Sequence, residues 1–154
     1  MPVIDISLVI AAPIERCFDL SRSIDLHLES MRHTNERAVG GVVSGLIGAG
    51  EAVTWEARHF GVTQRMTSRI TAFESPAYFQ DSMVRGPFAY FVHDHTFTSV
   101  AGGTRMRDHV RFASPLGLLG RIADRLLVTS HLRRLLEQRA EVIKQAAESP
   151  QPAN

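Results

Sequence analysis

The sequence predicts an α+β fold in which an antiparallel sheet of about seven strands packs against two short helices and a long C-terminal helix. Between residues 3 and 112, apolar and polar residues alternate in successive segments, as expected for strands with one buried face. After the first of these segments, and again from Pro115 to about Ala147, apolar residues recur at helical spacing. The later strands follow one another directly, which is typical of an antiparallel sheet.

Length and composition indicate a single domain with a substantial hydrophobic core. The chain has 154 residues, of which 44% are hydrophobic, and its formal net charge is +1. We expect residues 1–148 to form the domain and residues 149–154 to be a frayed tail. The charge is too small to predict nucleic-acid binding, so neither DNA nor RNA is expected as a partner.

The same data predict a cytoplasmic protein. Cys17 is the single cysteine, which excludes an intramolecular disulfide. The first residues lack the basic flank and the small-residue cleavage site of a signal peptide. No apolar run approaches the roughly 20 residues that a membrane-spanning helix needs, so we expect no transmembrane segment.

The first expected element is a strand from Val3 to Ile10, whose apolar residues share one face. Pro13 is suited to the first turn of a following helix, where its missing N–H is not needed. Ser23 is a candidate N-cap for a second short helix from Ile24 to Met31. Two short helices in tandem are therefore expected directly after the first strand.

Six further strands are expected before the C-terminal helix. Alternating segments near residues 36–43, 51–60 and 62–73 are separated by glycines, and the glycine-rich loop 44–50 could cover an opening. Three more strands fill residues 77–112, with turns at Gly86-Pro87 and at Ala101-Gly102-Gly103. Leu46 and Ile47, if exposed in their loop, would offer a contact for a homodimer.

The C-terminal helical segment changes the phase of its apolar stripe. Leu119 and Leu126 lie on one side of a helix, whereas Leu132 and Leu136 lie well over 90° away at about 100° per residue. One straight helix cannot bury both stripes. We therefore expect a break or kink near Val128 to His131, with a short lid-like helix before it and a long packing helix after it.

The three strands within residues 77–112 place histidines and aspartates on an otherwise apolar face. The expected turns bring Asp81 opposite His93, and His95 opposite Asp108. A buried carboxylate needs a partner, so such pairs would form in a purely structural core as well as in a binding site. Both interpretations stay open from the residues alone.

Two kinds of chemistry are compatible with these side chains. A histidine oriented by an aspartate could exchange a proton with a carbonyl substrate, as in aldol-type cyclisation or dehydration, without a covalent nucleophile. His93 and His95 could instead begin a zinc site that His59, Asp81 or Asp108 completes. Because that spacing is a weak signal, we expect no metal, and no cofactor.

A motif that runs from Phe79 to Phe97 carries a family resemblance. It reads F-x-D-x-x-x-x-G-P-F-x-x-F-x-H-x-H-x-F, and Gly102-Gly103-Thr104 and the segment PLGLLGRIADRL extend it. With the order of elements, it resembles the START-like superfamily, also called SRPBCC, in its polyketide cyclase/dehydrase-like ligand-binding branch. Relatives often carry Trp where this chain has Phe91, which enlarges the space slightly.

The resemblance covers nearly the whole chain and implies a helix-grip fold. In that fold a curved antiparallel sheet wraps around the long C-terminal helix and leaves a hydrophobic cavity between them. Members of the superfamily include lipid and small-molecule carriers as well as polyketide cyclases and dehydratases, so the fold alone does not fix an activity.

We therefore expect this protein to bind a hydrophobic or aromatic small molecule, lipid-like or polyketide-like, in that cavity. The alternative is a cyclase or dehydratase with His93, His95, Asp81 and Asp108 as catalytic residues. The expected ligand-binding residues are Trp55, His59, Met66, Phe79, Asp81, Met83, Phe91, His93, His95, Phe97, Asp108 and Leu126.

A third possible function is docking on a membrane or on another protein through the basic C-terminal helical segment. Its arginines are Arg121, Arg125, Arg133, Arg134 and Arg139. Basic surfaces of this kind attract anionic lipid headgroups.

Overall fold

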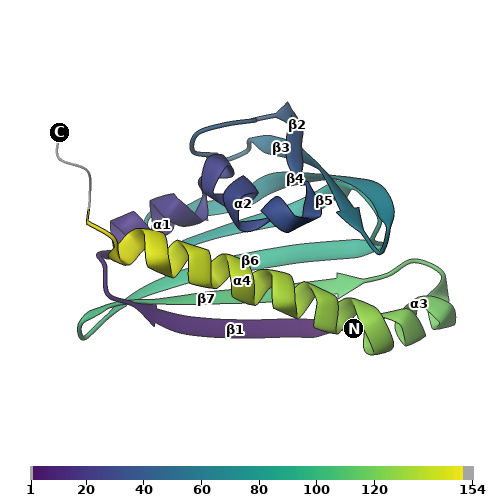
Figure 1. Cartoon of the computed structure of the whole chain (residues 1–154). Coiled ribbons are helices and arrows are strands. Elements are labelled where there is room, and N and C mark those ends of the chain that lie inside the picture. The colour runs from purple at the N-terminus through teal and green to yellow at the C-terminus, as the bar shows by residue number, and fades with distance from the viewer. Residues whose placement is uncertain (1, 151–154) are drawn as a thin grey trace.

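The computed structural model describes residues 2–150, whose seven strands form one antiparallel sheet in the order β1-β7-β6-β5-β4-β3-β2 (Figure 1). The strands are β1 (Val3–Ile10), β2 (Arg37–Gly41), β3 (Ala52–His59), β4 (Val62–Glu74), β5 (Tyr78–Arg85), β6 (Tyr90–Val100) and β7 (Gly103–Ala113). The first strand pairs with the last, so that the two edges of the sheet are β1 and β2. The predicted fold class is confirmed.

The helices lie together on one face of this sheet. After β1 come α1 (Ile14–Ser21) and α2 (Ile24–Ser30), and the long α4 (Thr129–Glu148) runs across the sheet beside them (Figure 1). The Ser23 hydroxyl accepts a hydrogen bond from the Leu26 N–H at 3.2 Å, which confirms the predicted N-cap. A sheet that curves around one long helix is the helix-grip arrangement that the family resemblance implies.

Phe18 of α1 is fully buried in the larger of two hydrophobic clusters. Its ring makes edge contacts, at 5.4–5.5 Å between centroids, with Phe73, Phe79 and Phe97 of the sheet. A smaller cluster around Phe112 packs under the first turns of α4. Polar side chains are buried in the interior as well, among them His93, His95 and Asp108.

The C-terminal helical segment corrects one prediction. Residues 117–148 are helical without a break, as α3 (Gly117–Ala123), a π-helical turn η2 (Asp124–Val128) and then α4. The expected break is therefore absent, and a π-helical turn that ends at Val128 stands where a break or kink was predicted. The wider π-helical turn holds extra residues, which changes the phase of the apolar stripe while the backbone stays helical. The Thr129 hydroxyl donates to the Asp124 carbonyl across this turn at 2.7 Å.

None of the helices within residues 2–150 is long and apolar enough to cross a bilayer. The helix α4 ends at Glu148, and residues 151–154 of the expected tail lie outside the described part of the chain.

The glycine-rich loop 44–50 folds back onto the start of α2. The Ile47 N–H donates to the Arg22 carbonyl at 3.1 Å, and Leu46 forms an isolated bridge with Ser23. Ile47 is buried and only Leu46 of the pair is exposed. The loop therefore covers part of the interior as expected, but it presents only one of the two residues on which the homodimer expectation rested.

Candidate functional site

A cavity of about 220 Å³ lies between the sheet and α4, and the start of α2 and loop 44–50 close one side of it. Of the residues predicted to bind a ligand, those that line it are Trp55, His59, Met66, Phe79, Asp81, Phe91, His93 and His95. They come from β3, β4, β5 and β6, which are neighbours in the sheet. Strand alternation on adjacent strands was thus enough to bring them together.

The remaining predicted residues lie elsewhere. Phe97 is part of the aromatic core around Phe18, and Asp108 lies behind the two histidines. Met83 is half-buried and is not among the lining residues. Leu126 is 68% exposed on the π-helical turn, which directs its side chain to solvent, so it does not line the cavity.

The exposed residues of the lining mark the opening. They are Phe60, Arg65 and Pro87, and all lie on the β3–β4 hairpin or in the loop between β5 and β6. Antiparallel order puts both turns at the same end of the sheet. The cavity therefore opens at that end, away from the Phe18 core.

The two histidines and two aspartates form one four-membered cluster. The strand register confirms that Asp81 lies opposite His93 and His95 opposite Asp108. The hydrogen bonds, however, run diagonally, from His93 Nε2 to Asp108 Oδ1 and from His95 Nε2 to Asp81 Oδ2, each at 2.7 Å. His95 Nδ1 lies 3.1 Å from Asp108 Oδ1 as well, so the predicted separate pairs are instead joined.

The contacts of His95 indicate that its ring is protonated and positively charged. Both of its ring nitrogens face carboxylates, which can only accept hydrogen bonds when ionised. Burial alone would lower the pKa of His95, but the hydrogen bonds and charges of Asp108 and Asp81 outweigh burial and raise that pKa above its usual value. His95 is therefore an imidazolium that bridges the two aspartates.

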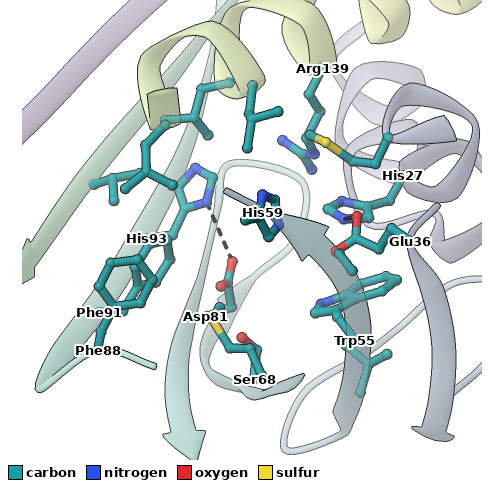
Figure 2. Close-up of a pocket in the computed structure, with 18 of the residues that line it drawn as sticks. His27, Glu36, Trp55, His59, Ser68, Asp81, Phe88, Phe91, His93 and Arg139 are labelled. Carbon is teal, nitrogen blue, oxygen red and sulfur yellow. Dashed lines mark hydrogen bonds and ion pairs between the residues drawn. The ribbon is translucent and has the colours of Figure 1, made fainter. Parts of the chain in front are cut away.

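The ring of His93, in contrast, is neutral. It stacks on His95 with 3.7 Å between centroids, and burial together with the His95 charge lowers the pKa of His93. Because Nε2 must donate to Asp108, the neutral ring carries its proton there. The free lone pair is then on Nδ1, which lies 3.8 Å from Asp81 Oδ2, beyond hydrogen-bond distance (Figure 2).

Both carboxylates are held in their charged form. Burial would raise the pKa of Asp108, but the hydrogen bonds from His93 and His95 outweigh it and hold that pKa well below its usual value. The pKa of Asp81 is lowered in the same way, against burial, mainly by the hydrogen bond from His95. The cluster thus has two negative charges and one positive charge before its neighbours are considered.

Within residues 2–150, Asp81, His93 and His95 form a group that could hold a metal ion. One ligand atom from each lies within 4.8 Å of the others. The same atoms are already used within the cluster, however, and the two imidazoles are stacked rather than directed at a common point. A zinc ion would have to displace these hydrogen bonds.

Arg139 of α4 supplies the missing positive charge, and the sequence interpretation of this residue is wrong. It is 6% exposed rather than part of a basic surface, and its Nη2 donates to the Ser21 carbonyl at 2.6 Å. Nη1 lies 3.6 Å from Asp108 Oδ1 and has no hydrogen-bond partner within residues 2–150. A signal existed, because Arg139 stands four residues from both Leu135 and Ile143 on the buried stripe.

Figure 2 shows Arg139 reaching down from α4 toward the cavity, with His93 and Asp81 on one side and Trp55 on the other. Ser68 lies on the sheet side, and its buried hydroxyl also has no hydrogen-bond partner among residues 2–150. Alternation along β4 predicts that Ser68 points inward, but a serine gave no signal of a role.

The wall opposite the cluster carries two further histidine contacts. His27 stacks on Trp55 at 4.1 Å between centroids, and its Nε2 lies 2.9 Å from Glu36 Oε2. Near the opening, His59 Nδ1 and His131 Nε2 lie 3.0 Å apart. Burial lowers the pKa of both His59 and His131, so these two form a neutral pair in which one ring donates to the other.

Comparison with known proteins agrees with the fold. A family described as polyketide cyclase/dehydrase and lipid transport matches residues 1–148. No curated protein gives a significant match.

Solved structures share the fold at low sequence identity. A protein from Thermus thermophilus is 19% identical with a TM-score of 0.76, over 96% of this chain and 100% of its own. The Zhui aromatase/cyclase from Streptomyces is 14% identical with a TM-score of 0.75, over 96% and 93%. The major latex-like protein 151 from Panax ginseng is 13% identical with a TM-score of 0.68, over 97% and 98%.

Proposed function

We propose that this chain, which belongs to the polyketide cyclase/dehydrase and lipid transport family, binds a hydrophobic small molecule that carries an uncharged, hydrogen-bond-accepting oxygen. The molecule would occupy the cavity between the sheet and α4, with its apolar body against Trp55, Met66 and Phe91. Its oxygen would face Arg139.

The observation that carries this proposal is Arg139 Nη1, which has no hydrogen-bond partner among residues 2–150. A buried donor left without an acceptor costs about 1–3 kcal/mol, and more when it is charged. Arg139 Nη1 is such a donor on the cavity wall. Ser68 Oγ is a second buried polar atom of the wall without a hydrogen-bond partner among residues 2–150. An oxygen of a bound ligand that accepts a hydrogen bond from Arg139 Nη1 would recover this loss.

The charges around Arg139 favour a neutral oxygen over a carboxylate. Arg139 and the protonated His95 offset Asp81 and Asp108, so this cluster is close to neutral without a ligand. A carboxylate beside Arg139 would add a third negative charge within a buried group, and burying unbalanced charge is costly. A ketone or quinone oxygen accepts from the guanidinium without that cost.

Native mass spectrometry of the purified protein, and calorimetric titration with the tricyclic ketone 9-fluorenone, test this function. We expect a co-purified small molecule or saturable binding of the ketone, either of which Ser68→Leu should abolish by filling the cavity. Thr63→Leu on the exposed face of the same strand is the matched control, and it should bind as the wild type does. Absence of both kinds of binding from the folded wild type would contradict the proposal.

A second candidate function, a cyclase or dehydratase, is favoured by the state of His93. Its Nδ1 carries a free lone pair on the cavity wall while Asp108 holds the other nitrogen, which is the arrangement of an oriented general base. In a dehydration, His93 Nδ1 would take the proton from the carbon next to a carbonyl, and Arg139 would donate a hydrogen bond to the enolate oxygen. The protonated His93 would then give this proton to the departing hydroxide, which leaves as water.

Dehydration of 4-hydroxy-4-phenylbutan-2-one, followed by ultraviolet absorbance of the enone, tests this second function. We expect catalysis that falls by about 10²–10⁴-fold in His93→Gln. His33→Gln, a substitution of an exposed histidine outside the cavity, should leave the rate unchanged. Equal rates with His93→Gln and wild type would remove His93 as the base and leave binding as the function.

A further inference from the structure

The helix α3 and the π-helical turn η2 expose apolar side chains where a water-facing helix would carry polar ones. The exposed apolar residues are Leu116, Leu118, Leu119, Ile122, Leu126 and Leu127, and we call them the leucine surface. Leu118 and Leu119 are each 70% exposed. So many large apolar side chains in one short segment exceed the scattered exposure that is normal for soluble proteins.

The segment is attached to the rest of the protein by its small and polar residues. Gly120 and Asp124 are its buried residues, and at about 100° per residue they lie opposite Leu118, Leu119 and Ile122. A Cβ on Gly120 would come within 2.1 Å of the Pro115 carbonyl, so only glycine allows this close approach. Asp124 accepts hydrogen bonds from the backbone N–H, at 3.1 Å, and the hydroxyl of Ser114.

This orientation is the reverse of ordinary amphipathic packing. A helix that covers a core turns its apolar stripe inward and its polar residues to water. Here the aspartate is buried and bonded, which fixes the helix with its leucines outward. The exposure is therefore built into the attachment of the helix and is not a consequence of a loosely held segment.

The charge of the surrounding surface identifies what would cover these leucines. Arg121 and Arg125 are exposed on the same segment. Between residues 113 and 128, all of which the structure describes, Asp124 is the one acidic residue, and it is buried. Apolar side chains flanked by arginines, without accessible carboxylates, fit an interface of acyl chains below anionic headgroups.

The β3–β4 turn adds an exposed aromatic residue to this end of the protein. Figure 1 shows α3 at the end of the molecule opposite the C-terminal end of α4, and the β3–β4 turn lies at that end of the sheet. Its Phe60 is exposed and contacts His131, at the start of α4, with 4.6 Å between ring centroids. Phe60 also lines the opening of the cavity.

We propose that this end of the protein docks on an anionic lipid surface, with the leucine surface inserted among the acyl chains and Arg121 and Arg125 at the headgroups. A second copy of the chain is a poorer occupant, because a symmetric contact would bring these arginines of both copies together. The docked protein would present the opening of its cavity to the membrane. Docking itself does not depend on whether the cavity binds a ligand.

Flotation with vesicles of phosphatidylcholine, with or without phosphatidylglycerol, tests the docking. We expect the full chain to float with the anionic vesicles and to be released in part by salt. Leu118→Ser combined with Leu119→Ser should lower the partition coefficient about tenfold or more, because the apolar area drives insertion. Arg121→Gln combined with Arg125→Gln should weaken binding to anionic vesicles specifically.

Matched variants at the other end of the sheet separate docking from nonspecific binding to the vesicles. Val9→Ser removes an exposed apolar residue from β1, and Arg105→Gln combined with Arg107→Gln removes two arginines from β7. Both should float as the wild type does. No flotation of wild type at low salt, or equal flotation of wild type and the leucine variant, would overturn the proposal. So would sedimentation velocity that shows a dimer which the leucine variant dissociates while vesicles bind neither.

Discussion

Replacing Asp108 with alanine is expected to lower the free energy of unfolding by about 3–5 kcal/mol. The carboxylate accepts from His93 at 2.7 Å, lies 3.1 Å from His95 Nδ1 and lies 3.6 Å from Arg139 Nη1. Its removal takes away a negative charge that two buried cations, protonated His95 and Arg139, share as a counter-charge. Urea unfolding at neutral pH, followed by circular dichroism, measures the loss.

Asp5 provides a matched control on the strand next to β7. Its carboxylate pairs with Arg107 and His109 on the outer face, where it is exposed to water. Asp5→Ala should cost only about 0–1 kcal/mol, the usual range for exposed ion pairs. A loss in Asp108→Ala no larger than that in Asp5→Ala would show that the cluster is not the buried charge network described above.

The stabilisation by Asp108 also has a defined pH dependence. A carboxyl group whose pKa is lowered on folding stabilises the protein fully above its unfolded pKa of about 3.9, and loses this contribution as pH falls through the folded value. The difference between wild type and Asp108→Ala should therefore shrink below about pH 4. His95 acts in the other direction, because a raised pKa gives stability that is lost as pH rises through it.

Alternation and turn residues were sufficient to predict the strands and the register of the β5–β6 and β6–β7 hairpins. The turns at Gly86-Pro87 and Ala101-Gly102-Gly103 fix which residues face one another, so the pairing of Asp81 with His93 and of His95 with Asp108 followed from counting along the strands. The diagonal hydrogen bonds could not be counted in this way. They depend on side-chain rotamers and on the stacking of the two imidazoles, which alternation does not specify.

The conformation of the C-terminal segment also could not be predicted fully from the pattern of its residues. The phase change of its apolar stripe was visible in the sequence, but a break and a π-helical turn produce the same change of phase. The choice between them depends on tertiary contacts, such as the bonds between Asp124 and Ser114. Arg139 was misplaced for a related reason, because an arginine on an apolar stripe is ordinarily directed to solvent unless the interior offers acceptors.

Replacing Arg139 with methionine should weaken binding of 9-fluorenone about 10–100-fold. A hydrogen bond from a charged donor contributes about 1.5–3 kcal/mol, and about 1.4 kcal/mol corresponds to a tenfold change in affinity. Methionine keeps much of the apolar stem but removes the Nη1 donor on the cavity wall. Isothermal titration calorimetry of both proteins measures the difference.

Fluorene, which has the same ring system without the carbonyl, separates the hydrogen bond from the shape of the cavity. If Arg139 acts through the oxygen, Arg139→Met should leave the affinity for fluorene nearly unchanged while it weakens the affinity for fluorenone. Arg134→Met replaces an exposed arginine of α4 outside the cavity lining, and both affinities should be those of the wild type. Equal losses for the two ligands would mean that Arg139 supports the cavity through the Ser21 carbonyl and that its second nitrogen contacts no ligand oxygen.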